Sequence, residues 1–240
     1  MIYDTAGEVI NQAASECGLT AVSDPYASSD PAFVQFRNLL NSAGRELLGL
    51  HEWQKLTTPY SFQTVGGQQE YPLPADFSHM IDQTNWDRDN RRPLGGPLSP
   101  QDWTYLLGGN ITTGTLYISF RMAEGVMKFL PDPLQSDHEI IFEYISKNWV
   151  LDQDGITRKD KAASKDDVIL YESILMVKFL KLRFLEAKGF DTTAAMNQFS
   201  SSFMVWTGKD MSAPVLSMAR NRIFPYLGWR NIPETNYGLP

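Results

Sequence analysis

The stretch at residues 52–77, EWQKLTTPYSFQTVGGQQEYPLPADF, is where one sequence pattern gives way to another. A helical spacing of apolar residues ends near Trp53, and two segments with alternating large side chains follow on either side of Gly66 and Gly67. Alternation at every second residue is typical of a strand, and a glycine pair supplies the positive φ angles of a tight turn. The stretch therefore predicts a β-hairpin. The large side chains expected on its shared face are Tyr60, Phe62, Tyr71 and Leu73.

Further β-rich segments follow this hairpin. Pro59 and Pro72 lack the N–H group that a central strand donates, so each is expected at the edge or the end of a strand. A turn is expected at DRDNRR, and Ser99 is expected to cap a short helix in SPQDWTYLL. The other candidate strands are residues 79–86, 115–122, 126–130 and 139–150. Residues 54–150 are therefore predicted to form a small antiparallel β domain.

Two helices are expected before this region. Residues 5–17 carry apolar residues at helical spacing, and Gly18 is a common kind of helix stop. The second helix has a clear start, because Asp30 can accept from the free N–H groups of the first turn, where Pro31 needs no donor. Its apolar stripe continues for about five turns. The residues of this stripe are Phe33, Phe36, Leu40, Ala43, Leu47 and Leu50.

Helical periodicity returns after the polar segment DQDGITRKDKAASKDD. Ser164 or Asp166 is expected to cap a helix that runs to Lys188 and ends at Gly189. Its polar side chains project in two groups with apolar side chains between them on both sides, so the helix needs more than one neighbour. The two groups are Lys178, Lys181 and Lys188 on the one hand and Glu172, Arg183 and Glu186 on the other.

A last helix is expected to start at an Asp191 cap and to end before Gly208. The complete pattern predicts an α+β fold, in which residues 1–53 and 151–208 form an antiparallel helical bundle and the β domain at 54–150 is inserted between them. Residues 209–240 contain four prolines and are expected to form an extended C-terminal arm. The apolar residues of the last helix are Met196, Phe199, Phe203 and Trp206.

Composition indicates a folded protein without a strong attraction to nucleic acid. The 240 residues are 42% hydrophobic and carry a formal net charge of −7, which disfavours a sequence-independent grip on phosphates. The single cysteine, Cys17, excludes an internal disulfide framework and is expected to be a small buried hydrophobic residue in a reducing compartment. The start of the chain lacks a basic region followed by an apolar run, and charged residues interrupt the apolar segment at 168–185. We therefore expect no membrane association.

No motif in the sequence predicts a catalytic, cofactor-binding or metal-binding residue, and we expect no enzyme. The glycine pairs lack the spacing of a phosphate-binding loop. The three histidines lack a second ligand at metal-binding spacing, which leaves open only a site that folding assembles. DQDG, at residues 152–155, begins like a calcium loop but lacks the third acidic position and the closing Glu, so a surface loop is expected. The histidines are His51, His79 and His138.

The C-terminal arm combines arginine with aromatic residues, which are enriched in the cores of protein interfaces. Three readings stay open: the arm wraps over its own domain, docks on another protein, or contacts nucleic acid. Three arginines would release few counterions from a nucleic acid. The residues expected in a docking arm are Arg220, Arg222, Phe224, Tyr226, Trp229, Arg230 and Tyr237.

Four segments, taken in order, resemble the head-to-tail adaptor proteins of short-tailed bacteriophages, the tail-tubular-protein-A type. That family has a helical bundle with an inserted β domain, and the resemblance covers about residues 30–205. The segments are EWQKL at 52–56, YPLPADF at 71–77, MKFLPDPLQSDHEIIFEYISKNWV at 127–150, and DDVILYESILMVKFLKLRFLEAKGFDTTAAMNQF at 166–199.

The resemblance implies a structural virion protein at the head-tail interface, assembled in the host cytoplasm. It implies a ring of twelve copies between the portal protein and the tail proteins, with a channel through which DNA passes without specific binding, and no cofactor. Acidic subunits suit such a channel, because like charges prevent strong phosphate contacts. A helix with two apolar faces would then touch both its own bundle and the next subunit.

Three alternatives remain open from the sequence. The first is another viral tail-completion or connector component, with a different neighbour. The second is a cell-wall hydrolase whose site is assembled from dispersed acidic residues and histidines. The third is a nucleic-acid-binding module, which would show a steep dependence of DNA affinity on salt.

Overall fold

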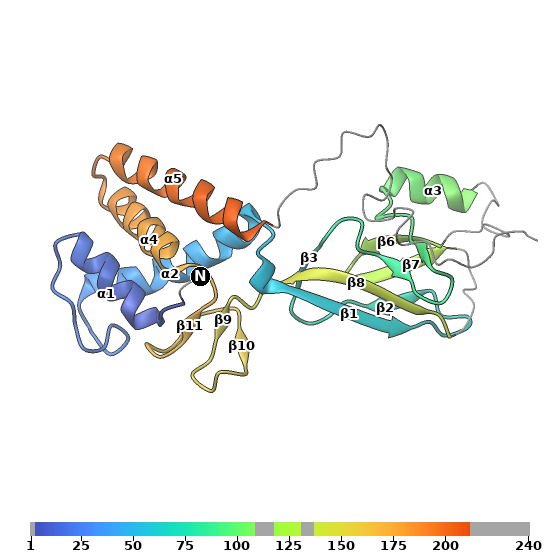
Figure 1. Ribbon diagram of the computed structural model, residues 1–240, viewed down its shortest axis with the longest axis horizontal. Helices are drawn as coiled ribbons and strands as arrows, with labels where there is room; N and C mark the ends of the chain where they lie inside the picture. Colours follow the sequence, from blue (N-terminus) through green and yellow to red (C-terminus); the bar gives the residue numbers. More distant parts are fainter. Residues whose placement is uncertain (1–2, 109–117, 131–136, 212–240) are drawn as a thin grey trace, which may run out of the picture.

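The computed structural model describes residues 3–108, 118–130 and 137–211. Four helices and a small three-stranded sheet occupy one end of an elongated molecule, and the other two antiparallel sheets with one further helix occupy the other end (Figure 1). This confirms the predicted α+β fold. The helices are α1 (Ala6–Glu16), α2 (Pro31–Leu50), the 3-10 turn η1 (Gln54–Leu56), α3 (Pro100–Gly108), α4 (Ser173–Lys188) and α5 (Thr193–Asp210).

The described strands form three antiparallel sheets. A five-stranded sheet has the order β1-β8-β4-β5, with β3 also paired to β8; the two smaller sheets have the orders β2-β7-β6 and β10-β9-β11. The strands are β1 (Thr57–Gln63), β2 (Glu70–Pro72), β3 (Phe77–Met80), β4 (Trp86–Asp87), β5 (Arg92–Pro93), β6 (Ser119–Ala123), β7 (Val126–Leu130), β8 (Glu139–Ser146), β9 (Val150–Leu151), β10 (Arg158–Lys159) and β11 (Val168–Ile169).

The first two helices begin where their capping residues predict. The Thr5 hydroxyl accepts from the Glu8 N–H at 3.3 Å, and the Glu8 carboxylate accepts from the Thr5 N–H at 2.8 Å, a reciprocal capping box. The Asp30 carboxylate accepts from the Ala32 N–H at 2.8 Å, with Pro31 in the first turn. Each cap satisfies an N–H group that has no partner inside its helix.

The start of α4 differs from the prediction, and neither Ser164 nor Asp166 caps it. Residues 168–169 are β-branched and form β11, which pairs with β9. The fully buried Asp167 carboxylate accepts from the N–H groups of Ala163 and Ser164 at 2.8 and 2.9 Å, so it closes a loop in front of this strand. The helix therefore begins only at Ser173.

The ends of α4 and the position of α5 follow the prediction more closely. Gly189 ends α4 in a left-handed conformation with φ +73°, and its N–H donates to the Glu186 carbonyl at 3.0 Å. The Asp191 carboxylate accepts from the Thr193 N–H at 3.0 Å at the start of α5. The predicted end before Gly208 is wrong, because α5 continues to Asp210. A glycine costs a helix about 1 kcal/mol, a cost that the hydrogen bonds of Asp210 described below can offset.

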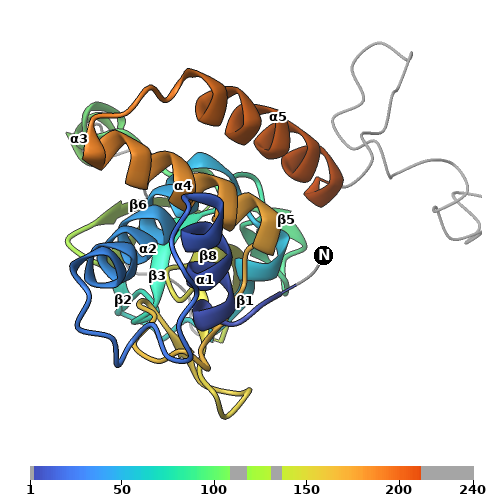
Figure 2. The same cartoon turned by 90° about the vertical axis from the view of Figure 1, so that its left-hand side faces the viewer.

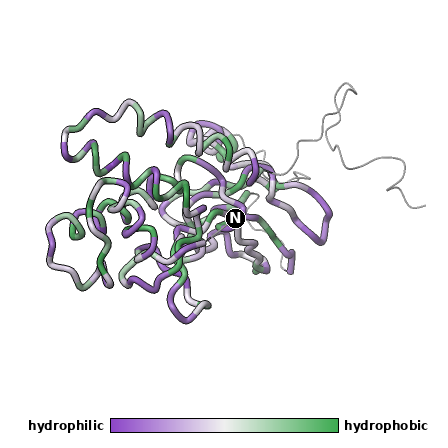
Figure 3. Tube along the Cα trace, turned by 60° about the vertical axis from the view of Figure 1, so that its left-hand side comes forward, coloured by the Kyte–Doolittle hydropathy of each residue, from purple (hydrophilic) through white to green (hydrophobic). Residues whose placement is uncertain are grey.

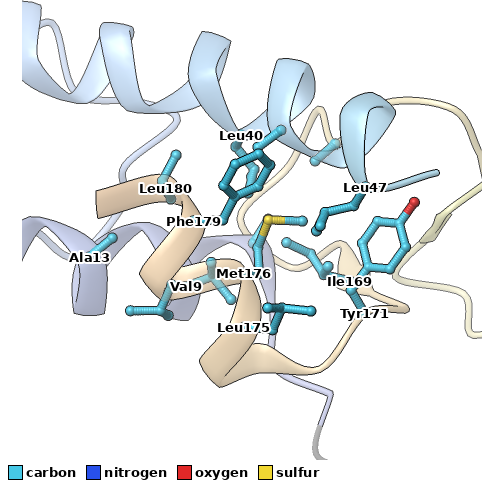
Figure 4. Close-up of a cluster of buried hydrophobic side chains, with 14 of the residues drawn as sticks. Val9, Ala13, Leu40, Leu47, Ile169, Tyr171, Leu175, Met176, Phe179 and Leu180 are labelled. Carbon is cyan, nitrogen blue, oxygen red and sulfur yellow. The ribbon is translucent and has the colours of Figure 1, made fainter. Parts of the chain in front are cut away.

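Helix α4 is the centre of the bundle and packs against α1, α2 and α5 (Figures 1 and 2). Met176 lies among side chains of α1 and α2, with Val9 on one side and Leu47 on the other, in the close-up of the core (Figure 4). The Phe184 ring stacks on Phe36 of α2 at 4.3 Å between centroids, and Phe179 stacks on Phe199 of α5 at 4.4 Å. Both apolar faces of α4 are thus covered by its own chain. The two-faced pattern is therefore explained largely within the chain, and a contact of this helix with the next subunit stays a prediction.

The predicted hairpin between residues 57–63 and 70–73 does not form. Strand β1 pairs with β8 over seven residues, from Thr57 with Ile145 to Gln63 with Glu139, whereas β2 pairs with β7 in another sheet. The long β8 offers β1 more ladder hydrogen bonds than the three-residue β2 could. The expected aromatic contact still exists, because the Phe62 and Tyr71 rings stack at 4.6 Å.

The two prolines occupy the predicted edges. Pro59 lies in β1, at the edge of the five-stranded sheet, and Pro72 is the last residue of β2, at the edge of its sheet. The candidate strand at 126–130 is confirmed as β7, and the Ser99 hydroxyl accepts from the Asp102 N–H at 3.1 Å at the start of α3. The candidate at 115–122 is described only from residue 118 onward, where β6 lies.

Two other candidate strands are each split by a turn. The segment at 79–86 divides into β3 and β4 around Gln83, whose φ is +62°. The segment at 139–150 divides into β8 and β9, and between them the Trp149 side chain leaves the sheet and lies fully buried among the helices. The expected turn at DRDNRR is confirmed between β4 and β5.

The described residues contain two separate clusters of buried hydrophobic side chains. The larger one joins the four helices to β9 and β11 and also includes Leu56, Ile145 and Trp149. The smaller one lies between the two sheets that contain β8 and β7. The division into domains with boundaries at 54 and 150 remains a prediction.

Hydrophilic residues gather in the connecting loops, whereas helices and strands alternate between hydrophobic and hydrophilic (Figure 3).

Gly44 of α2 is the point where the end of the β region enters the bundle. A Cβ atom added there would lie 2.3 Å from the Trp149 ring, so only glycine allows this contact. The Tyr171 hydroxyl donates to the Gly44 carbonyl at 2.9 Å, and its ring stacks on Trp149 at 5.7 Å.

Among the described helices, none has both the length and the apolar character that crossing a bilayer requires.

Candidate functional site

The predicted docking arm lies outside the described residues. This holds for Arg220, Arg222, Phe224, Tyr226, Trp229, Arg230 and Tyr237. Their role therefore stays a prediction. The structure describes the chain up to residue 211, so it includes only the first three residues of the predicted arm at 209–240, of which 209 and 210 belong to α5.

The start of the arm is held at the junction between the bundle and the sheets. Asp210, the last residue of α5, is buried, and its carboxylate accepts from the Gln54 N–H at 3.0 Å. His51 Nε2 lies 3.1 Å from the same oxygen, and its ring packs edge-on against Trp53. Lys55 Nζ lies 5.4 Å from the centre of the Tyr3 ring, so residue 3 is at the same junction, and burial followed by the charge of Asp210 raises the pKa of Tyr3. The arm therefore starts from a fixed position.

The solvent-facing side of α5 carries no charged residue from Thr193 to Gly208. The opposite side packs on α4 through Phe199, which is buried. On the outer side Met204 is 73% exposed and Val205 is 52% exposed. The exposed residues of this stretch, which we call the α5 outer face, are Thr193, Ala194, Met196, Asn197, Gln198, Ser201, Met204, Val205 and Gly208. A two-layer bundle in water normally carries charges on such a face.

A short hairpin projects from the bundle on the side opposite to α5 (Figures 1 and 2). It consists of β9, β10 and the six residues between them, which include DQDG, here a turn as predicted. The Asp154 carboxylate accepts from the N–H groups of Ile156 and Thr157 and from the Thr157 hydroxyl, and these bonds lower its pKa, the hydroxyl most of all. The turn is therefore well ordered. It nevertheless exposes 84% of Ile156.

The base of this hairpin is fixed by ion pairs with one buried and two half-buried partners. Lys159 Nζ lies 2.8 Å from Asp167 and 3.3 Å from Asp152. Burial disfavours the charged form of Asp167, but the hydrogen bonds from Lys159, Ala163 and Ser164 outweigh it and lower its pKa. The geometry suits a rigid projection rather than a catalytic group, because Lys159 joins Asp152 of the hairpin to the buried Asp167 in front of β11.

One group of side chains in the β region could hold a metal ion. Ligand atoms of Asp87, Asp89 and His138 lie within 4.8 Å of one another. The Asp87 carboxylate already accepts from the Asn90 side chain at 2.7 Å and lies 3.2 Å from His138 Nδ1, and Asp89 accepts from the Glu139 N–H at 2.6 Å. These bonds tie the β4–β5 turn to the start of β8.

Sequence reasoning missed this group, because His138 is about fifty positions from Asp87 and Asp89 and meets them only when β4 pairs with β8. The other two histidines lie elsewhere: His51 is at the junction, and His79 is in β3, where its Nδ1 lies 3.2 Å from the Ser78 hydroxyl. Cys17 is half-buried against the helical core, and this burial raises the pKa of its thiol.

The fold defines an α+β protein, and comparison with family models places it among the structural adaptor proteins of bacteriophages. The model described as SU10 adaptor protein matches residues 4–214, so the chain belongs to the SU10 adaptor protein family. The match spans the bundle, the sheets and the start of the arm. A search of curated proteins found no match.

Family membership supports the expected class, a phage adaptor protein, but not the expected type, a connector of short-tailed phages. The protein is a virion component of a phage, and an adaptor of this kind interacts with other head or tail proteins. The class is structural and generally not enzymatic. The more specific resemblance, to connectors of short-tailed phages, goes beyond what the family match shows.

Proposed function

We propose that the protein is the subunit of a head-to-tail adaptor ring, which joins the portal to the tail and leaves a channel for DNA. The observation that carries this proposal is the family match over residues 4–214. An adaptor must bind one neighbour above and another below, and an elongated subunit with two hydrophobic cores suits that task. We propose twelve copies, assembled in the host cytoplasm, with the portal protein and tail proteins as partners.

The charge of the chain favours passage of DNA over binding. With a net charge of −7, a ring of these subunits would repel phosphates at long range, and a passing duplex would release few counterions. Several cations of the bundle are engaged by acidic neighbours. Arg183 is paired with Glu46 and Glu186, and Lys181 lies 3.2 Å from Glu16. We expect DNA affinity to be weak at physiological salt.

The C-terminal arm is the proposed contact with the portal. Its arginine and aromatic residues are the types that dominate binding energy in protein interfaces. The anchoring of Asp210 to Gln54 and His51 supports this role, because an arm that starts from a fixed point loses less entropy on docking.

Analytical ultracentrifugation with and without the portal protein of the same phage tests the proposed function. We expect the free protein to sediment as a ring already, or to form one when the portal is added. A protein that stays monomeric and binds neither portal nor tail proteins would overturn the proposal. If it binds a tail protein but never the portal, it is another connector component instead.

The arm can be tested in the same experiment with a charge-matched pair of variants. Arg230→Ala removes one cation from the arm, and Arg88→Ala removes one from an exposed position outside it. We expect only the first to weaken portal binding, by about tenfold for an interface arginine. Equal binding by the two variants would show that the arm is not the portal contact.

A further inference from the structure

The α5 outer face and the β9–β10 hairpin form a pair of surfaces on opposite sides of the bundle. Two perpendicular views show α5 on one side and the hairpin on the other (Figures 1 and 2). A ring of identical subunits with cyclic symmetry needs two different patches that meet head to tail, unlike a two-fold dimer, in which one patch meets itself. Two different surfaces on opposite sides of one subunit therefore fit a ring with cyclic symmetry.

The chemistry of the two surfaces is complementary. The α5 outer face is uncharged and exposes Met196, Met204 and Val205 among small and polar residues. Unbranched Met side chains adapt their shape to an inserted group. The hairpin presents Ile156, 84% exposed, on a turn whose Asp154 carboxylate is bound to its own backbone. An apolar knob on such a turn can enter an uncharged face without leaving a charged side chain of that face unpaired.

Ile156 and Met204 are the two most exposed of the large hydrophobic side chains in the described residues. Phe36, Met176 and Leu180 are fully buried, and the polar side chains of α4 are engaged with neighbouring helices, as Lys178 is with Ser202 of α5 at 2.6 Å. Ile156 and Met204 are left exposed by the same chain. Burying apolar side chains of this size is favourable, so a partner that covers both gains binding free energy.

We infer that the β9–β10 hairpin of one copy inserts Ile156 into the α5 outer face of the next copy, and that this contact closes the ring. The inference rests on the proposed function, since it assigns the surfaces by which the ring subunits meet. It assigns this role to the hairpin and α5, and not to α4, whose two apolar faces are covered within the chain.

Directed cross-linking tests the contact. In a Cys17→Ser background, Ile156→Cys and Met204→Cys are made separately, and the two full-length proteins are mixed with portal protein and a short bis-maleimide. We expect one covalent dimer in the mixture and none with either variant alone. The double variant should give a ladder of covalent oligomers. Replacing Met204→Cys by Tyr105→Cys, on α3 and 71% exposed, provides the control and should give no product.

Charge substitutions give a second, independent readout. Ile156→Asp should weaken ring assembly at least about tenfold, because it buries a charge in an apolar contact, and Met204→Lys should restore part of the loss by pairing with it. Tyr105→Asp should leave assembly unchanged. Since all three side chains are exposed, circular dichroism should show an intact fold in each variant.

The outcomes separate the inference from the proposed function. Rings on the portal without the mixed cross-link, or rings unaffected by Ile156→Asp, would overturn the assigned contact and leave the ring proposal standing. A cross-link by Ile156→Cys alone would show that hairpins meet each other, which also overturns it. The absence of any assembly by the unmodified protein would overturn the ring proposal, and the contact with it.

Discussion

The helical and β regions of this chain are stabilised in different ways. The core of the helical region contains 28 described buried residues, of which eight are aromatic, whereas the core of the β region contains nine, of which five are aromatic. Each ring in the β core therefore carries a larger share of the buried apolar surface. The bundle is therefore stabilised by many buried contacts, whereas the β region depends on a few aromatic contacts.

The largest expected effects come from one phenylalanine in each core. Phe129→Ala removes a ring that contacts Phe62, Tyr71 and Phe120, and Phe36→Ala removes a ring stacked on Phe184. Each should cost about 3–5 kcal/mol in the free energy of unfolding of its own region.

Urea unfolding followed by far-UV and near-UV circular dichroism distinguishes the two variants. Phe129→Ala should lose near-UV signal from the β region at a urea concentration where the helical signal persists. Phe36→Ala should lower the midpoint of the helical transition. Coincident transitions in both variants would show that the two regions unfold as one unit and would contradict their separate stabilisation.

The junction between the regions gives the next effect. Gly44→Ala should destabilise the protein by about 3 kcal/mol, because the new Cβ would collide with the enclosed Trp149 ring. Gly49→Ala, in the same helix with no atom within 4 Å, should instead stabilise it by about 0.5–1 kcal/mol. Thermal unfolding measures both. Equal effects of the two changes would mean that Trp149 does not couple the regions.

Because of the charged groups at the base of the hairpin, we expect the free energy of unfolding to depend on pH. Because the pKa of Asp167 is lowered in the folded state, its contribution is full above the unfolded value of 3.8 and is lost as pH falls through the folded value. Asp167→Asn should cost about 2 kcal/mol at neutral pH, and the difference from the unmodified protein should shrink in acid. The exposed Asp166→Asn is the control. A difference that stays constant with pH would contradict this assignment.

The smallest effect concerns the first helix. Thr5→Ala removes both hydrogen bonds that the Thr5 hydroxyl forms in the capping box with Glu8 and should cost about 1 kcal/mol. Gln12→Ala, exposed in the same helix, should be close to neutral. Chemical denaturation measures the difference. A cost below that of Gln12→Ala would show that tertiary contacts alone determine where α1 begins.

The helices could largely be predicted from the sequence because their signals are local. Thr5 and Asp30 cap the first two helices within a few positions of themselves, and Gly189 ends α4 by its own backbone conformation. The start of α4 could not be predicted, because residues 168–169 become a strand only when β9 is available to pair with them.

The β region and the candidate surfaces depend on contacts that are distant in sequence. The hairpin predicted around Gly66 failed because β1 finds a longer partner about eighty residues away, in β8. The two-faced pattern of α4 was correct, but periodicity does not tell whether a face is covered by the same chain or by another. Likewise, the exposure of Ile156 and Met204 became visible only with the fold.

Electron microscopy of the purified protein mixed with the portal protein of the same phage tests the central claim most directly. We expect closed rings seated on the portal, with an open central channel and the hairpin of each subunit against α5 of its neighbour. Single copies that remain free in solution beside an undecorated portal would contradict it.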